Sequence, residues 1–264
     1  MSFRPAVFAS LAVGLALAPS TRSVPAAATL RYRIEAKNQT TVDLSAFGQA
    51  PQEQTLGLTA WVVVTLRDTT GGRVMHVVVD SAKYEGTLPL GQESVDSAKG
   101  GVIHGFVDAG GRVKNLEATP RANLFMAQIQ GVMGNIFPRV KGGAKAGDTW
   151  TDTTEVNNNA GGANTKTKLI SNYTAGAQES VSGLPAMRLK TTYTSSTTGT
   201  LDNQMGTMEI EGTGSGTGAY LVGSDGSYLG STSTTSLDQK LKTAMAPAPI
   251  PVKTVQTLTV TLIK

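Results

Sequence analysis

The chain has 264 residues and a formal net charge of +4, with lysines and arginines scattered among acidic residues. No basic stripe stands out, so the sequence predicts no nucleic-acid partner. Cysteine is absent, which excludes disulfides, thiolate metal sites and lipid attachment through an N-terminal cysteine. Aromatic residues make up only 5% of the chain, whereas glycine and threonine are abundant. β-Branched residues together with turn formers favour strands, so the composition predicts an all-β protein with mainly antiparallel pairing.

The first 28 residues follow the three-part pattern of a secretory signal peptide. Arg4 is the only early charge, residues 5–19 carry none, and Ala26 and Ala28 satisfy the small-x-small rule before Thr29. The apolar run is shorter than the about 20 residues that a membrane-spanning helix needs. We therefore expect residues 1–28 to be a signal peptide and residues 29–264 to form a single β-rich domain. That domain is expected in the periplasm or outside the cell, with no transmembrane segment.

Apolar and polar residues alternate along most of the remaining chain, which is the pattern of half-buried antiparallel strands. Turns rich in glycine separate the alternating segments at 69–72, 108–111 and 224–226 and predict hairpins. The expected strands cover residues 30–42, 55–68, 73–86, 148–156, 164–175, 185–199, 207–218 and 254–264, with a further hairpin around 108–111. Alternate prolines within 244–252 predict an extended connector before the last strand. The sequence thus predicts a curved, meandering sheet or half-barrel.

One segment departs from this alternation. Phe125, Ile129 and Ile136 recur at helical spacing and predict an inserted apolar helix at about 121–137, ended by Pro138. No charge falls in its interior, so the helix should be covered on most sides. Three roles are open to it: an ordinary core helix, a movable lid over a ligand cavity, or an element docked on a membrane surface.

No residue pattern predicts a catalytic or metal site. His76 and His104 lie in predicted strands, and a third zinc ligand would have to be an unsupported carboxylate, so neither a metal nor a cofactor is expected. The stretch GTGSGTG at 212–218 lacks the strand–turn–helix context of a nucleophilic serine. Glu209 and Glu211 share one face of a predicted strand, an arrangement open to a pair of hydrolytic carboxylates, but the sequence places no aromatic residue nearby to stack a sugar. We expect a protein that is not an enzyme.

The segment PRVKGGAKAGDTW, from Pro138 to Trp150, resembles a stretch found in uncharacterised exported bacterial β-rich proteins. In pattern, the leader, the long meandering strands and the apolar helix are similar to the half-barrel lipoprotein carriers of the bacterial periplasm, the LolA and LppX type. This resemblance implies a curved sheet wrapped around helices and an apolar cavity for acyl chains. The missing lipobox cysteine separates the chain from membrane-anchored members, so the resemblance implies a soluble carrier.

These observations lead to one main hypothesis and two alternatives. The main hypothesis is a soluble exported binding protein that carries a lipid or another hydrophobic small molecule between sheet and helix. Its candidate ligand-binding residues are Trp61, expected to face inward from the sheet, and Phe125, Ile129 and Met133 of the helix; burial there would contribute about 25 cal/mol per Å². The same residues fit a solid core equally well. The alternatives are a structural or adhesive cell-envelope protein with a protein partner and no cavity, and a carboxylate-dependent hydrolase.

Overall fold

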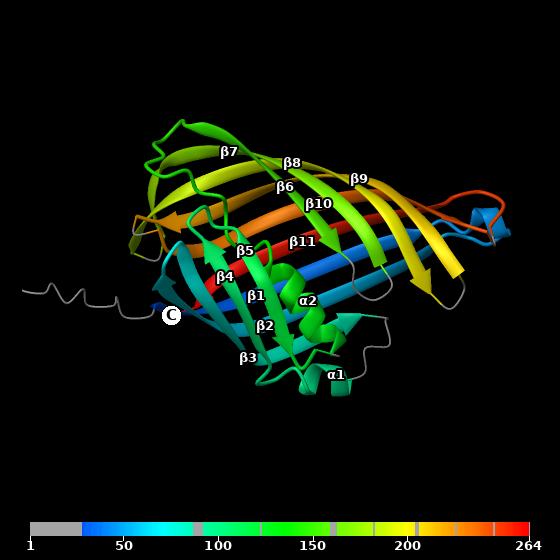
Figure 1. The fold of residues 1–264 in the computed structure, drawn as a ribbon, viewed down its shortest axis with the longest axis horizontal. Coiled ribbons are helices and arrows are strands. Elements are labelled where there is room, and N and C mark those ends of the chain that lie inside the picture. The colour runs from blue at the N-terminus through cyan, green and yellow to red at the C-terminus, as the bar shows by residue number, and fades with distance from the viewer. Residues whose placement is uncertain are drawn as a thin grey trace, which may run out of the picture.

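The structure is a computed structural model, and it describes residues 28–263 apart from 87–91, 122, 159–162, 182, 204–205, 225 and 245. The predicted signal peptide lies outside the described residues, except for Ala28, where the first strand begins. A single antiparallel sheet of 11 strands dominates the described part, together with two short α-helices and one 3-10 turn (Figure 1). The all-β, mainly antiparallel prediction is confirmed.

Apart from β5 and β6, consecutive strands pair with each other in antiparallel fashion, as the meander prediction requires. The elements are β1 (Ala28–Val42), η1 (Ser45–Phe47), β2 (Gln52–Thr69), β3 (Gly72–Gly86), α1 (Gln92–Asp96), β4 (Val102–Asp108), β5 (Val113–Thr119), α2 (Leu124–Met133), β6 (Thr149–Asn158), β7 (Ala163–Val181), β8 (Leu184–Asn203), β9 (Gly206–Gly223), β10 (Tyr228–Thr243) and β11 (Ile250–Ile263). Because β1 also pairs with β11, the order across the sheet is β5-β4-β3-β2-β1-β11-β10-β9-β8-β7-β6. The strands β5 and β6 are the two edges, and the curved sheet is not closed into a barrel (Figure 1).

Alternation along each strand decides which side chains face the core. In β2, every second residue from Leu56 to Leu66 is buried, and the residues between them are more exposed. A slip of one residue in strand pairing would move this whole apolar set to the opposite face, so the pattern fixes the register. The turn to β3 places Gly71 at φ +83°, a left-handed conformation that glycine adopts at no steric cost.

The hydrophobic core lies inside the curve of β1–β5, where α2 covers the sheet (Figure 1). The side chains of Phe125, Met126, Ile129 and Met133 in α2 are fully buried in one cluster with apolar residues of β1 to β5. Within the described residues, no helix combines the length and apolar character needed to cross a membrane.

The helix is shorter than predicted. It spans 10 residues, beginning after Asn123, whose side chain accepts a hydrogen bond from the backbone N–H of Met126 at 2.9 Å. Its last residue is Met133, well before Pro138, and Gly134 caps it by donating its N–H to the carbonyl of Gln130. Gly134 and Asn135 are two successive residues of low helix propensity, which favours an end here. Ile136 therefore reaches the core from a non-helical segment.

The connector before the last strand is also shorter than predicted, since β11 begins at Ile250. Pro251 pairs with Lys240 of β10, and its carbonyl oxygen accepts a hydrogen bond from the N–H of Asp43 at 2.9 Å. A proline lacks the N–H donor but keeps this acceptor, so it can belong to a strand wherever only its carbonyl is needed.

Candidate functional site

The two halves of the concave face differ in chemistry and in covering. Over β1–β5 the inward side chains are apolar and packed against α2. Over β6–β11 the inward positions are mostly hydroxyl-bearing, amide or glycine residues, as in the row Ser171, Tyr193, Gly216, Thr235 and Gln256 that crosses β7 to β11. Most of these inward side chains are half-buried rather than packed in a core. This half of the face is therefore more polar and less tightly packed than the half that α2 covers.

A pocket of about 190 Å³ lies on the concave face, bordered by the segment after α2 and by β6–β11. It combines an apolar wall, three tyrosines and several polar groups. The residues around it are Asn135, Phe137, Arg139, Thr154, Leu169, Tyr173, Tyr193, Tyr220, Ser233, Thr235, Gln256 and Leu258. Sites for drug-sized ligands usually measure about 300–1,000 Å³, so this pocket is large enough for only part of such a molecule.

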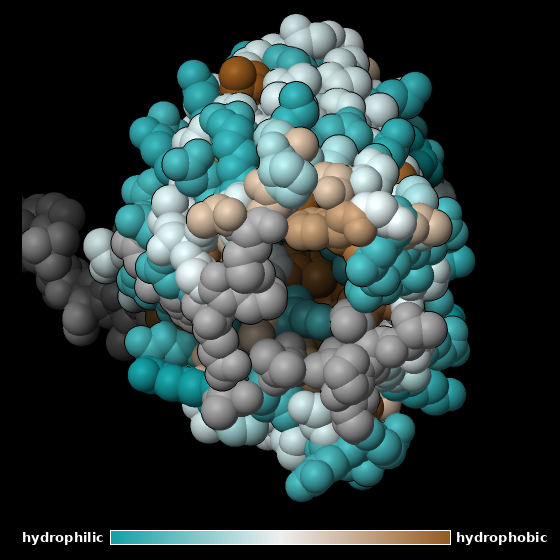
Figure 2. All heavy atoms as spheres, turned by 90° about the vertical axis from the view of Figure 1, so that its right-hand side faces the viewer, coloured by the Kyte–Doolittle hydropathy of each residue, from teal (hydrophilic) through white to brown (hydrophobic). Residues whose placement is uncertain are grey.

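The concave face continues from the pocket toward one end of the molecule. Inward residues along this stretch, such as Ser195, Leu237 and Thr254, remain half-buried. That end, on the right of Figure 1, is hollowed, and both hydrophobic and hydrophilic residues are visible inside the hollow (Figure 2).

Glycines of β9 make room for the side chains beside the pocket. A Cβ added to Gly214 would lie 2.5 Å from Cδ2 of Leu237 and 2.5 Å from Oγ of Ser195. Both distances are shorter than non-bonded contacts allow. A Cβ at Gly216 would collide with the ring of Tyr193. The alternate glycines of GTGSGTG therefore let side chains of β8 and β10 lie across β9, which is a structural role for this stretch.

The tyrosines form an aromatic row from β6 to β9. Trp150 stacks on Tyr173 with ring centroids 5.4 Å apart, and Tyr173 lies 6.5 Å from Tyr220. Tyr193 hydrogen bonds with the hydroxyl of Thr235. Burial, followed by the neighbouring tyrosines, raises the pKa of Tyr220, so its hydroxyl stays protonated and can donate a hydrogen bond.

A charged cluster of Arg112, Arg139 and Asp152 adjoins the pocket, and Arg139 is its member in the pocket lining. Arg112 donates to Oδ1 of Asp152 at 2.6 Å, and Nε of Arg139 lies 3.6 Å from Oδ2 of the same carboxylate. The guanidinium of Arg139 also donates to the carbonyl of Gly111. Burial alone would raise the pKa of Asp152, but hydrogen bonds from Arg112 and Thr154 and the charges of both arginines hold it below its ordinary value.

This cluster also links the two edges of the sheet. Arg112 immediately precedes β5, and Asp152 lies in β6, so their ion pair spans the gap between the edge strands. Arg112 contacts β6 again through the carbonyl of Thr153, at 3.3 Å. The segment from Pro138 to Trp150 reinforces the connection, because the indole N–H of Trp150 donates to the carbonyl of Arg139 at 2.8 Å.

The predicted ligand-binding residues are not the ones around this pocket. Phe125, Ile129 and Met133 are fully buried in the core between helix and sheet. Trp61 lies on the outer face, since its neighbours Ala60 and Val62 are the buried ones and strand side chains alternate. Its ring faces the cations of Arg33 and Lys83, at 5.9 and 5.7 Å from the ring centroid. The expectation that Trp61 faces inward is therefore wrong.

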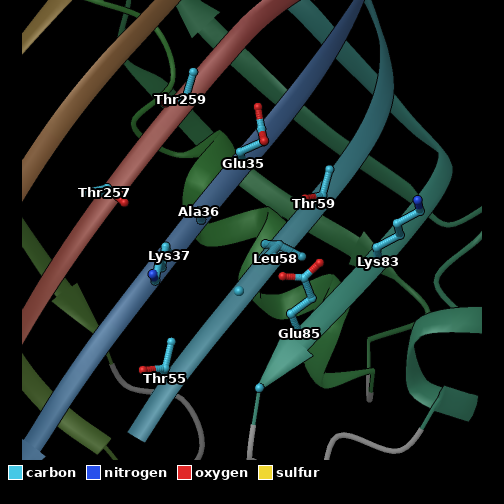
Figure 3. Close-up of a pocket in the computed structure, with 12 residues that line it drawn as sticks. Glu35, Ala36, Lys37, Thr55, Leu58, Thr59, Lys83, Glu85, Thr257 and Thr259 are labelled. Atoms are coloured by element: carbon cyan, nitrogen blue, oxygen red, sulfur yellow. The ribbon is translucent and has the colours of Figure 1, made fainter.

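A second depression lies on the outer face, over β11, β1, β2 and β3 (Figure 3). It measures about 540 Å³, and its charged lining residues include Glu35, Lys37, Lys83 and Glu85. In Figure 3 these side chains stand on the side of the sheet away from α2. Three of the four, Lys37, Lys83 and Glu85, are exposed, so the depression is a groove between solvated side chains and excludes water less well than the concave pocket.

The carboxylates considered for hydrolysis are paired with cations. Glu209 and Glu211 flank Lys242, whose Nζ lies 3.9 and 3.0 Å from their oxygens. Four carboxyl groups of the described residues have a pKa that departs clearly from its ordinary value, and all four are lowered. They belong to Asp43, Asp108, Asp152 and Glu155. A general acid requires the opposite shift.

No protein-family model and no curated protein matches this chain. Among solved structures, OccK2 (OpdF) of Pseudomonas aeruginosa in complex with glucuronate is 6% identical, over 89% of this chain and 98% of that one, with a TM-score of 0.22. OmpT, an outer membrane protein of Vibrio cholerae, is 7% identical over 89% and 99% of the two chains, with a TM-score of 0.19. Similarity this low carries no argument about the fold or function of this chain.

Proposed function

We propose that this protein is an exported, non-enzymatic binding protein that takes the apolar part of an amphipathic small molecule, such as a lipid, into the concave pocket. The observation that supports this most is the composition of the pocket. Phe137, Leu169 and Leu258 supply apolar surface, and hydroxyl groups lie beside them. Among the described residues, no hydrogen bond satisfies the hydroxyl of Tyr220, which is free to bind a polar group of the ligand.

The size of the pocket narrows the ligand class. A volume of about 190 Å³ suits one ring or a short stretch of acyl chain. The rest of the molecule would lie along the half-buried inward residues toward the hollowed end (Figure 2). Burial of apolar surface, at about 25 cal/mol per Å², would supply most of the affinity.

Export rests on the sequence pattern of residues 1–28, and the absence of enzymatic activity rests on the chemistry of the site. Glu209 and Glu211 pair with Lys242, and Asp108, Asp152 and Glu155 have lowered pKa values, which weighs against the carboxylate-dependent hydrolase. The competing hypothesis is a structural or adhesive envelope protein. The ligand-binding experiment below distinguishes it from a carrier.

A large side chain that fills the pocket is expected to weaken ligand binding. Ser233 lines the pocket from β10, whereas Thr234 is exposed on the outer face of the same strand. Ser233→Phe should weaken binding of a fluorescent fatty acid by at least about tenfold, or 1.4 kcal/mol, because the new ring occupies the ligand's volume. Fluorescence titration of the purified protein measures the affinity.

Thr234→Phe is the matched control, since it adds the same ring one residue away on the opposite face. It should leave the dissociation constant within about twofold of wild type. Far-UV circular dichroism and the Tm of each variant establish that it is folded. Failure of the wild-type protein to bind fatty acids and phospholipids would contradict the carrier proposal and favour the envelope protein.

A further inference from the structure

We propose that His76 and His104 form a zinc-binding pair on the outer face of the sheet. His76 in β3 and His104 in β4 are directly opposite each other in the strand register. Their Nδ1 atoms are 3.3 Å apart, and the ring centroids are separated by 4.8 Å. Both nitrogens therefore point into the same small space between the two rings.

This separation matches the spacing of two ligands on tetrahedral zinc. With Zn–N bonds of about 2.0–2.1 Å and tetrahedral angles, two coordinating nitrogens lie about 3.3–3.4 Å apart. Square-planar coordination would bring them closer, to about 2.9 Å. A zinc ion could thus bind both nitrogens without any movement of the strands.

Without a metal ion, one imidazole must donate its Nδ1 proton to the other, since two facing lone pairs repel. Zinc needs both lone pairs, so the donor imidazole takes its other tautomer, with the proton on Nε2. No net proton is released when both rings are neutral at the start.

The surroundings of the pair leave it open to solvent ions. His104 is exposed, and His76 is half-buried. Glu117 of β5 is opposite His104 in the register, but its carboxylate pairs with Arg121 at 3.2 Å. In the part of the chain that the structure describes, no group of three or more His, Cys, Asp or Glu side chains is placed to hold a metal ion. Water would therefore fill the remaining coordination positions.

This site is separate from the concave pocket. Met75 and Val77, on either side of His76, are fully buried in the core, so His76 points to the opposite face. Zinc binding and ligand binding can consequently be tested without interference, and either can fail alone.

Isothermal titration of the untagged full chain with ZnCl2 at pH 7.5 is expected to show one site. His76→Gln and His104→Gln should each weaken zinc binding by at least about tenfold, because each removes one of two protein ligands. Zinc should also raise the Tm of wild type and leave the Tm of both variants unchanged.

Val74→Gln is the matched control, since it places the same new side chain on the same face, two residues from His76. Val74 is 46% exposed, and this variant should bind zinc as wild type does. Imidazole 15N shifts should change at Nδ1 of both rings when zinc is added. The proposal is overturned if wild type shows no stoichiometric binding, or if the histidine variants bind zinc as tightly as the control.

Discussion

Replacing Phe125 with alanine is expected to lower the free energy of unfolding by about 3–5 kcal/mol, the range found for large-to-small changes at buried aromatic residues. Phe125 is 0% exposed and packs within the single cluster that joins α2 to the sheet. The change removes buried apolar surface and leaves a cavity that the long strands cannot easily collapse to fill. Equilibrium unfolding in urea measures the loss.

The same substitution at Phe47 provides the control, because this side chain in η1 is 41% exposed. Phe47→Ala should change stability by no more than about 0.5 kcal/mol. Comparing the stability losses of Phe125→Ala and Phe47→Ala also shows whether the helix is part of the core or a movable lid. A cost below about 1 kcal/mol for Phe125→Ala would mean that α2 is a loosely attached lid rather than part of the core.

Replacing Asp152 with alanine is expected to cost about 2–3 kcal/mol, because the carboxylate balances two arginines at the gap between β5 and β6. A fully buried ion pair that loses one partner typically costs about 3–5 kcal/mol. The expected cost is smaller here, since the side chain of Arg112 is 42% exposed and solvent screens its charge. The side chain of Arg139, at 14% exposure, accounts for most of the effect.

The contribution of Asp152 should depend on pH in a defined direction. Its pKa is lowered in the folded protein, so the folded state favours the charged form more than the unfolded chain does. The stabilisation is therefore complete above the unfolded pKa of about 3.9 and is lost as pH falls through the lower folded value. Urea unfolding at pH 7 and pH 3 should show the difference between wild type and Asp152→Ala shrinking at pH 3.

Glu155→Ala is the control on the same strand. Glu155 pairs with Lys166 at 2.9 Å, but both side chains are at least half exposed, so little change in stability is expected at either pH. Equal losses for the two variants would contradict the assigned role of the Asp152 cluster in holding the sheet edges together.

Much of the fold follows from local sequence patterns. Alternation places the strands, and glycine-rich turns such as the one at Gly71 define the hairpins. The pairing of β1 with β11 depends on residues more than 200 positions apart, such as Ile34 and Val260, so no local pattern predicts it. The end of α2 was misplaced because apolar spacing continues to Ile136 after the helix has stopped at Gly134.

The site was harder to predict than the fold. The apolar stripe of Phe125, Ile129 and Met133 indicates burial, and burial suits a solid core as well as a cavity. The outward position of Trp61 was already implied by the buried face of its own strand. The pocket itself is built from β6 to β11 and the segment after α2, and only the curvature of the sheet brings Tyr173, Tyr220 and Leu258 around one space. Alternate glycines in β9 were the one local signal that neighbouring side chains need room there.

Native mass spectrometry of the purified protein with added fatty acid or lysophospholipid tests the central claim most directly. Our account predicts a one-to-one adduct for wild type and Thr234→Phe that disappears under denaturing conditions, and no adduct for Ser233→Phe. An unoccupied wild-type protein, or equal adducts in all three proteins, would contradict a ligand site in the concave pocket.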